Sequence, residues 1–142
     1  MGETGKDALR VHFDARVRLE FRGATITSDA GLLACRELDD ALSLTQAASM
    51  HLQESRGGRN VQHKLVPLLR QSVYSRLAGY EDTNDAQRLA RDPAMRLITS
   101  RRASERHAAS SNTLSRFETK VLTRSENLEG LTQLNAEWVK QV

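Results

Sequence analysis

The sequence predicts a mainly α-helical domain with a short β element near its start. The chain of 142 residues is long enough for one modest core. Aromatic residues make up only 4% of it, which leaves that core to aliphatic side chains. Apolar residues recur at helical spacing over most of residues 28–140. With 39% hydrophobic and 27% charged residues, the composition is typical of a soluble globular protein.

Several classes of protein are excluded by what the sequence lacks. No apolar run is long enough to cross a bilayer, and the start, MGETGKDALR, has no signal-peptide core. Cys35 is the only cysteine, so an internal disulfide and a zinc site built from several thiolates are excluded. We therefore expect a cytoplasmic protein without a membrane partner.

The β element is expected after a disordered start over residues 1–15. From Val17 to Phe21 apolar residues alternate with charged ones, which is the pattern of a half-buried strand. Gly23 marks a turn, and residues 24–27 are a candidate return strand.

Two helices are expected next. Ser28 is a good N-cap residue, and Asp29 in the first turn suits the helix dipole. Cys35 is expected to be a small core residue, with a reactive thiol as the alternative. A second helix over residues 44–53 should end before the paired glycines at 57–58. The apolar face of the first helix should contain Leu32, Leu33, Leu38 and Leu42.

The third helix is expected to begin near Lys64, because Pro67 fits most easily in a first turn. An earlier start would place a kink at Pro67. Gly79 should end the helix in the left-handed conformation. Its apolar face should contain Leu65, Leu69, Val73 and Leu77, which follow one another at four-residue steps.

Four carboxylates follow in quick succession: Glu81, Asp82, Asp85 and Asp92. Asp92 precedes Pro93, as expected of an N-cap with proline at the first helical position. Thr83 or Asn84 can cap a short helix over residues 85–90. The alternative is a metal site at Asp82 and Asp85, which would need both carboxylates to converge on one cation. We expect these acids to shape the backbone.

The last third of the chain is basic at first and then helical. Residues 100–112 have no apolar periodicity and are expected to form an exposed basic loop. Leu114, Phe117 and Val121 then indicate a helix. Its N-cap is Ser111, Asn112 or Thr113, and the spacing of Ser115 and Glu118 also allows a capping box. A final apolar stripe runs from Leu128 to Trp138, in a helix that begins or is interrupted near Gly130.

This basic helical segment is the strongest candidate site. Helices that read DNA in helix-turn-helix modules often have a polar start of this kind. Asn112 could read adenine and Arg116 guanine, while the preceding arginines hold phosphates. The alternative is an ordinary amphipathic helix whose charges face solvent. The residues predicted to contact DNA are Arg101, Arg102, Arg106, Asn112, Ser115, Arg116 and Lys120.

Three segments carry a resemblance to a known family: ITSDAGLLACRELDDALSLT, LVPLLRQSVYSRLAGYEDTNDAQRLARDPAMRL and SSNTLSRFETKV. They resemble, in family order, the amino-terminal region of insertion-sequence transposases of the DDE class, and most of all the IS thirteen-eighty group. The resemblance covers roughly residues 13–142 and implies cutting and joining of DNA at the ends of a mobile element. The family uses three acidic residues on an RNase H-like fold and two divalent metals, Mg²⁺ being the implied cofactor.

The resemblance assigns no catalytic residue to this chain, because the first catalytic aspartate of the family follows the region matched here. We therefore expect no catalytic residue, metal ligand or cofactor in the chain, and an inactive fragment of a transposase. The expected partners are double-stranded DNA at element ends and a second copy of the chain, but no small-molecule substrate, in a cytoplasmic, nucleoid-associated setting. The alternatives are an assembly module that packs on the catalytic domain or a second subunit, and a small metal-dependent nuclease. The expected organisation is a disordered segment (1–15), a β element plus helical domain (16–99), a basic loop (100–112) and a helical segment leading toward the catalytic domain (113–142).

Overall fold

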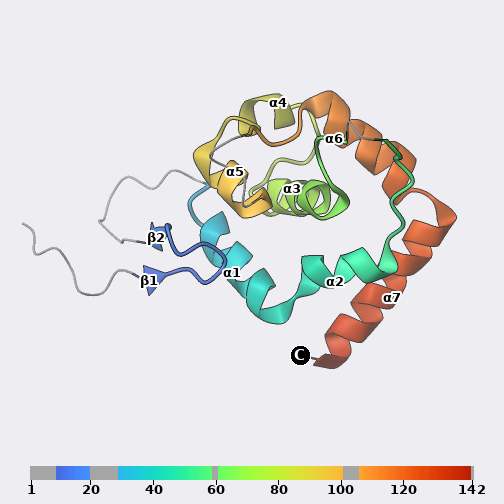
Figure 1. The fold of residues 1–142 in the computed structure, drawn as a ribbon, viewed down its shortest axis with the longest axis horizontal. Coiled ribbons are helices and arrows are strands. Elements are labelled where there is room, and N and C mark those ends of the chain that lie inside the picture. Colours follow the sequence, from blue (N-terminus) through green and yellow to red (C-terminus); the bar gives the residue numbers. More distant parts are fainter. Residues whose placement is uncertain (1–8, 20–28, 59–60, 101–105, 142) are drawn as a thin grey trace, which may run out of the picture.

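The computed structural model describes residues 9–19, 29–58, 61–100 and 106–141. Helices dominate these ranges, which confirms the mainly α-helical fold class. Figure 1 shows α3 in the middle of the fold, with the other helices arranged around it. The helical elements are α1 (Leu32–Leu42), α2 (Leu44–His51), α3 (Leu65–Leu77), α4 (Ala86–Leu89), α5 (Pro93–Thr99), α6 (Ser111–Phe117), the π-helical segment η1 (Glu118–Leu122) and α7 (Ser125–Gln141).

The β element is a two-stranded antiparallel ribbon beside α1 (Figure 1). Strand β1 (Leu9–Arg10) pairs with β2 (Arg18–Leu19). The strand predicted around Val17 to Phe21 is therefore present in part, but its partner precedes it. The predicted return strand, residues 24–27, and the predicted cap Ser28 lie outside the described residues.

Residues 11–13 anchor the start of the chain to α1. Val11 and Phe13 are buried, and the guanidinium of Arg36 lies 5.0 Å from the centre of the Phe13 ring. The backbone N–H of His12 also donates to the carboxylate of Glu37 at 2.8 Å. The described part of the expected disordered segment 1–15 thus belongs to the fold, because two apolar side chains hold it there.

Helix α3 is the hub of the core. It begins after Lys64, so that Pro67 lies in the first turn as predicted, where it costs no helical hydrogen bond. Gly79 has a φ of 90° and closes a Schellman motif. In this motif Tyr80 N–H donates to Ser75 O at 2.9 Å, and Gly79 N–H donates to Arg76 O at 3.0 Å.

Two apolar clusters meet at α3. The first joins α2, α3, α6, η1 and α7, and the second joins α1, α3, α4 and α5. Leu65, Leu68 and Leu69 contribute to the first and Tyr74 to the second. The predicted stripe holds at the start of α3 but fails at Leu77, which is 62% exposed. Because α3 is surrounded by other helices, its buried surface is wider than one stripe.

The predicted face of α1 is correct only in part: Leu32 is buried and Leu33 packs against the second apolar cluster. Leu38 is 60% exposed and Cys35 is exposed, so neither is a core residue. The buried face consists of Leu32, Arg36 and Asp39. Two of these residues are charged, and they are buried because they pair with groups on neighbouring elements, which apolar periodicity cannot reveal.

Helix α7 is longer than predicted and is continuous through Gly130. It packs against α2 at this residue, where an added Cβ would lie 2.1 Å from the carbonyl oxygen of His51. Glycine is therefore required by close helix packing, not by a break in the helix. Leu134 is buried, while Leu128 and Val139 remain exposed.

Among the described residues, no helix is both long and apolar enough to span a membrane.

Candidate nucleic-acid interface

Helix α6 begins with a side-chain cap. The Ser110 hydroxyl oxygen accepts a hydrogen bond from the backbone N–H of Thr113 at 3.4 Å. We expected the cap within residues 111–113, so the observed cap lies just before that range. The alternative capping box of Ser115 and Glu118 does not form, because the Glu118 carboxylate is bound to α3 instead.

Helix α6 and η1 follow one another without a break, and together they bury one face and expose the other. The buried face, formed by Leu114, Phe117 and Val121, belongs to the first apolar cluster. Four of the exposed side chains here recur at four-residue steps: Asn112 and Arg116 on α6, Lys120 on η1, and Arg124 in the turn between η1 and α7. We call the last three of these the basic row.

An ion pair between α3 and η1 holds in place the helical segment that carries the basic row. Arg76 donates to Glu118 at 2.7 Å, and the Ser72 hydroxyl donates to the same carboxylate at 2.6 Å. Partial burial raises the pKa of Glu118, but the hydrogen bonds from Arg76 and Ser72 outweigh burial and lower the pKa overall. The π-helical turn, a geometry often found at functional sites, is thus fixed to the central helix.

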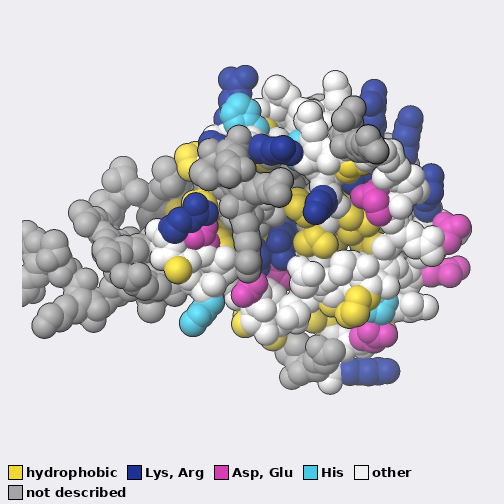
Figure 2. All heavy atoms as spheres, in the orientation of Figure 1, with side chains coloured by type: hydrophobic (Ala, Val, Ile, Leu, Met, Phe, Trp, Pro, Cys, Tyr) yellow, Lys and Arg dark blue, Asp and Glu magenta, His cyan; other side chains and the backbone are white. Residues whose placement is uncertain are grey.

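The basic row is free of neutralising partners within the described part of the chain. Its three cations form no ion pair there, and Arg124 Nε donates a hydrogen bond to the Lys120 carbonyl at 3.2 Å. In Figure 2, Lys and Arg side chains line the edge of the molecule where α6 and η1 lie in Figure 1.

Arg106 is exposed next to the start of α6. It lines a cavity of about 520 Å³ together with Ser110 and Thr113. Its backbone carbonyl accepts a hydrogen bond from Arg96 Nε at 3.1 Å, which fixes this end of the loop against α5.

The structure brings some of the predicted DNA-contacting residues together and leaves others apart. Asn112, Arg116 and Lys120 share one exposed face, with Arg106 near the start of their helix. Ser115 is only half-exposed, and its carbonyl accepts a hydrogen bond from the Thr119 hydroxyl at 2.8 Å. Arg101 and Arg102 lie outside the described residues.

The set of residues predicted to contact DNA omits Arg124 and Lys64, two exposed cations near this surface. Arg124 could have been found, because it follows Lys120 at the same four-residue step. Lys64 could not, because only the fold brings the start of α3 close to the loop before α6.

The local architecture differs from a helix-turn-helix module. Helix α6 follows α5 only after residues 100–110, whereas the helices of such a module are joined by a turn of about three or four residues. It packs on α3 and α4. The comparison with reading helices therefore holds for the polar start of α6 and not for the arrangement around it.

Two of the four acids in residues 81–92 bind the backbone as expected, whereas Asp85 gives no side-chain cap and pairs with Arg88 at 3.6 Å. Asp92 caps α5 by accepting the Met95 N–H at 2.9 Å, as predicted. Asp82 accepts the Asn84 N–H at 2.7 Å in a turn before α4, so neither Thr83 nor Asn84 supplies the expected side-chain cap. Across the described ranges, no group of three or more His, Cys, Asp or Glu residues is placed to hold a metal ion.

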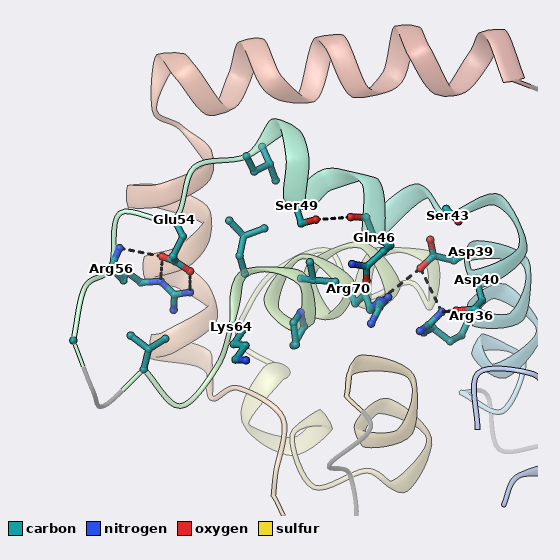
Figure 3. Close-up of a pocket in the computed structure, with 16 residues that line it drawn as sticks. Arg36, Asp39, Asp40, Ser43, Gln46, Ser49, Glu54, Arg56, Lys64 and Arg70 are labelled. Atoms are coloured by element: carbon teal, nitrogen blue, oxygen red, sulfur yellow. Dashed lines mark hydrogen bonds and ion pairs between the residues drawn. The ribbon is translucent and has the colours of Figure 1, made fainter. Parts of the chain in front are cut away.

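A pocket of about 760 Å³ lies between α1, α2 and the start of α3, and Figure 3 shows its lining. Most of its cations are neutralised by acids of the same pocket. Arg36 lies 3.3 Å from Asp40, and Arg56 pairs with Glu54. Since paired charges have little capacity for an external anion, this pocket is a weak candidate for binding DNA.

Asp39, which lines this pocket, is also the centre of a buried polar network. It accepts hydrogen bonds from Thr45 N–H at 2.8 Å and from the Tyr74 hydroxyl at 2.6 Å. Arg70 Nε lies 3.7 Å from the same carboxylate. Burial raises the pKa of Tyr74, and the hydrogen bond to Asp39 raises it further, so the tyrosine stays a neutral donor. This network ties α1, α2 and α3 together and accounts for the charged face of α1.

Fold and surface together define a helical domain with an exposed basic face, whose cations form no ion pair with the described residues. Residues 9–142 match the family model described as "Transposase DDE domain group 1". The chain therefore belongs to this transposase family, and its function lies in DNA transposition. No curated protein and no solved structure matches the chain. The resemblance to DDE transposases is thus confirmed, while the narrower IS thirteen-eighty assignment stays a prediction.

Proposed function

We propose that the chain is the amino-terminal, non-catalytic part of a DDE transposase, and that it binds DNA at the ends of the mobile element. The observation that carries this proposal is the basic row, which runs along the outer face of α6 and η1 to the turn before α7. Its cations are unpaired within the described residues, and the helical segment beneath them is fixed to the central helix by the Arg76–Glu118 ion pair.

The row can supply both parts of DNA recognition. Exposed arginines and lysines neutralise phosphates and release counterions, which gives affinity without sequence preference. Arg116, the first member of the row, and Asn112, one turn before it, can reach base edges, guanine for the guanidinium and adenine for the amide. Arg106, which lines a cavity with Ser110 and Thr113 at the start of the helix, would bind a DNA phosphate while these residues contact bases in the groove.

A non-catalytic role is supported by the acids of residues 81–92. The family's chemistry needs carboxylates that converge on two divalent metals. Here Asp92 is engaged as a helix cap and Asp82 in a turn. The test is incubation of the chain with supercoiled DNA and Mg²⁺, in which we expect no cleavage. Cleavage that disappears in Asp82→Asn would contradict the proposal.

The DNA contact is tested with a double variant, Arg116→Gln with Lys120→Gln, in fluorescence-anisotropy titrations of a DNA duplex. Removing two phosphate or base contacts should weaken binding at least tenfold and reduce the salt dependence of log Kd by about two. Lys140→Gln is the matched control, because Lys140 is exposed near the far end of α7. Losses that are equal for each charge removed, in the control and in the double variant, would show that only total charge matters.

An assembly module is the second candidate, and the exposed apolar side chains of α7 favour it. Leu128 is 51% and Val139 is 62% exposed. The rest of the stripe between them is largely used within the chain, because Leu134 is buried and Gly130 lies against α2. Concentration-dependent association in sedimentation without DNA, abolished by Leu128→Glu with Val139→Glu, would support this candidate. A monomer at all concentrations would contradict it.

A further inference from the structure

A second basic surface lies beside α6, on the side of the α3 start. Two adjoining cavities of about 230 and 520 Å³ share five lining residues: Gln62, His63, Arg106, His107 and Ala108. We call the two cavities together the basic hollow. Each exceeds the roughly 30 Å³ share of a single water molecule many times over, so there is room for a polyatomic anion and its hydration.

The lining of the basic hollow is positive. Lys64, Arg96 and Arg106 contribute cations, and His63 and His107 contribute imidazoles. Among the described residues that line it there is no carboxylate. This distinguishes it from the larger pocket of Figure 3, in which three acids face the cations. An anion entering the basic hollow would therefore meet charge that the protein has not already neutralised.

One wall of the basic hollow is held rigidly in place. The Arg106 carbonyl is bound by Arg96, and Ala108 N–H donates to the Ala90 carbonyl at 2.9 Å. The buried amide of Gln71 then makes two hydrogen bonds to the backbone of Ala109, at 2.7 and 2.8 Å. The backbone that carries Arg106 and His107 is thus positioned before any ligand arrives, which lowers the entropic cost of binding.

The other wall includes the start of α3. Lys64 is its N-cap residue, and no side chain caps the first turn of this 13-residue helix. The first N–H groups therefore lack an intrahelical partner, and the helix dipole places partial positive charge at this end. The positive potential in the basic hollow therefore has two independent sources, the cationic side chains that line it and the N-terminus of α3.

His63 lines both cavities of the basic hollow, and its pKa depends on the surrounding charges. Burial lowers its pKa, and the nearby Arg106 and Arg56 lower the pKa further. Near neutral pH its imidazole is consequently uncharged in the empty hollow and can donate one hydrogen bond. A bound anion would reverse the electrostatic effect of the arginines and favour the protonated, doubly donating form.

We propose that the basic hollow binds a phosphate group, with Arg106 and Lys64 as its charged contacts and His63 and His107 as hydrogen-bond donors. The group is either a phosphodiester of the DNA backbone or a free phosphate. For the DNA backbone the inference rests on the proposed function. The hollow then supplies a phosphate contact next to the start of α6, separate from the basic row, and fixes the register of that helix on the duplex.

The first arm of the test uses inorganic phosphate and needs no DNA. The side-chain ring signals of His63 and His107 are followed by NMR during a phosphate titration at constant ionic strength, with sodium chloride as the reference. We expect saturable shifts in the unaltered chain and at least a tenfold weaker response in Arg106→Gln, whose exposed side chain can be replaced without disturbing the core. Shifts that match those in chloride, or that persist unchanged in Arg106→Gln, would overturn the site.

The second arm identifies the source of the phosphate. The double variant Arg106→Gln with His107→Gln is compared with Lys140→Gln in DNA anisotropy titrations. If the hollow holds a DNA phosphate, affinity should fall about fivefold or more and the salt slope by about one. Unchanged DNA affinity together with a phosphate response would assign the hollow to free phosphate. No DNA binding by the unaltered chain would contradict the proposed function, while the first arm would still decide the phosphate site.

Discussion

Gly130 is the position at which the packing of α7 on α2 can be tested most sharply. An alanine Cβ at this position would lie 2.1 Å from His51 O and 2.9 Å from His51 C. Both atoms belong to the backbone of α2, so no side-chain rotation can relieve the clash. To reach an ordinary contact of 3.4 Å, the helices would have to move apart by about 1.3 Å, the difference between 3.4 and 2.1 Å.

The expected effect of Gly130→Ala is the balance of two opposed terms. Alanine is favoured over glycine in a helix interior by about 1 kcal/mol. Overpacking a close contact costs about 1–3 kcal/mol, and a backbone clash belongs at the upper end of that range. We therefore expect Gly130→Ala to lower the free energy of unfolding by about 2 kcal/mol. Urea denaturation followed by far-ultraviolet circular dichroism measures this change.

Asn135→Ala is the matched control, because Asn135 is exposed on the same helix. Its substitution should stabilise the chain by no more than about 0.7 kcal/mol through helix propensity. If Gly130→Ala proved stabilising by a similar or larger amount, α7 would not contact α2 at this residue, and the described packing would be refuted.

Three further predictions follow from named contacts. Asp92→Ala removes the cap of α5 and should lower the free energy of unfolding by about 1 kcal/mol in urea denaturation; no change would mean that the cap does not form. Glu118→Gln should destabilise the chain at pH 7, because the folded pKa of Glu118 lies below its usual value of 4.5. This contribution is present above pH 4.5 and is lost as the pH falls through the folded pKa, so the difference between the two chains should shrink as the pH is lowered below 4.5; a difference that does not change with pH would contradict it. In DNA anisotropy, Arg116→Ala should relax sequence preference, whereas Arg101→Ala should weaken all duplexes about equally; equal, sequence-blind losses in both would remove the reading role of α6.

Features set by a few neighbouring residues could be predicted from the sequence. The start of α3 before Pro67 and the left-handed end at Gly79 follow from the backbone limits of proline and glycine. The cap at Asp92 follows from its side-chain chemistry and the proline after it. Such signals are local, so no knowledge of the fold is needed to interpret them.

Features that depend on partners from distant segments could not be predicted in this way. The buried face of α1 is charged because Asp39 binds Tyr74, which lies on another helix. Gly130 suggested a helix break until its close approach to His51 was visible. For the candidate site, the four-residue spacing of the basic row could be recognised in the sequence. The hydrogen bond from Ser72 of α3 to Glu118 of η1, which supports the row, and the cavity around His63 are evident only in the tertiary structure.

Binding of the chain to element-end DNA can be measured in a single titration. The purified chain is titrated into a labelled duplex carrying an element end and into a scrambled duplex of the same composition, each across a salt series without divalent metal. We expect at least tenfold tighter binding to the element end, about 1.4 kcal/mol, and a preference that persists as salt rises. Equal binding to both duplexes that is lost with salt would contradict this expectation, because it would leave only a sequence-blind basic surface.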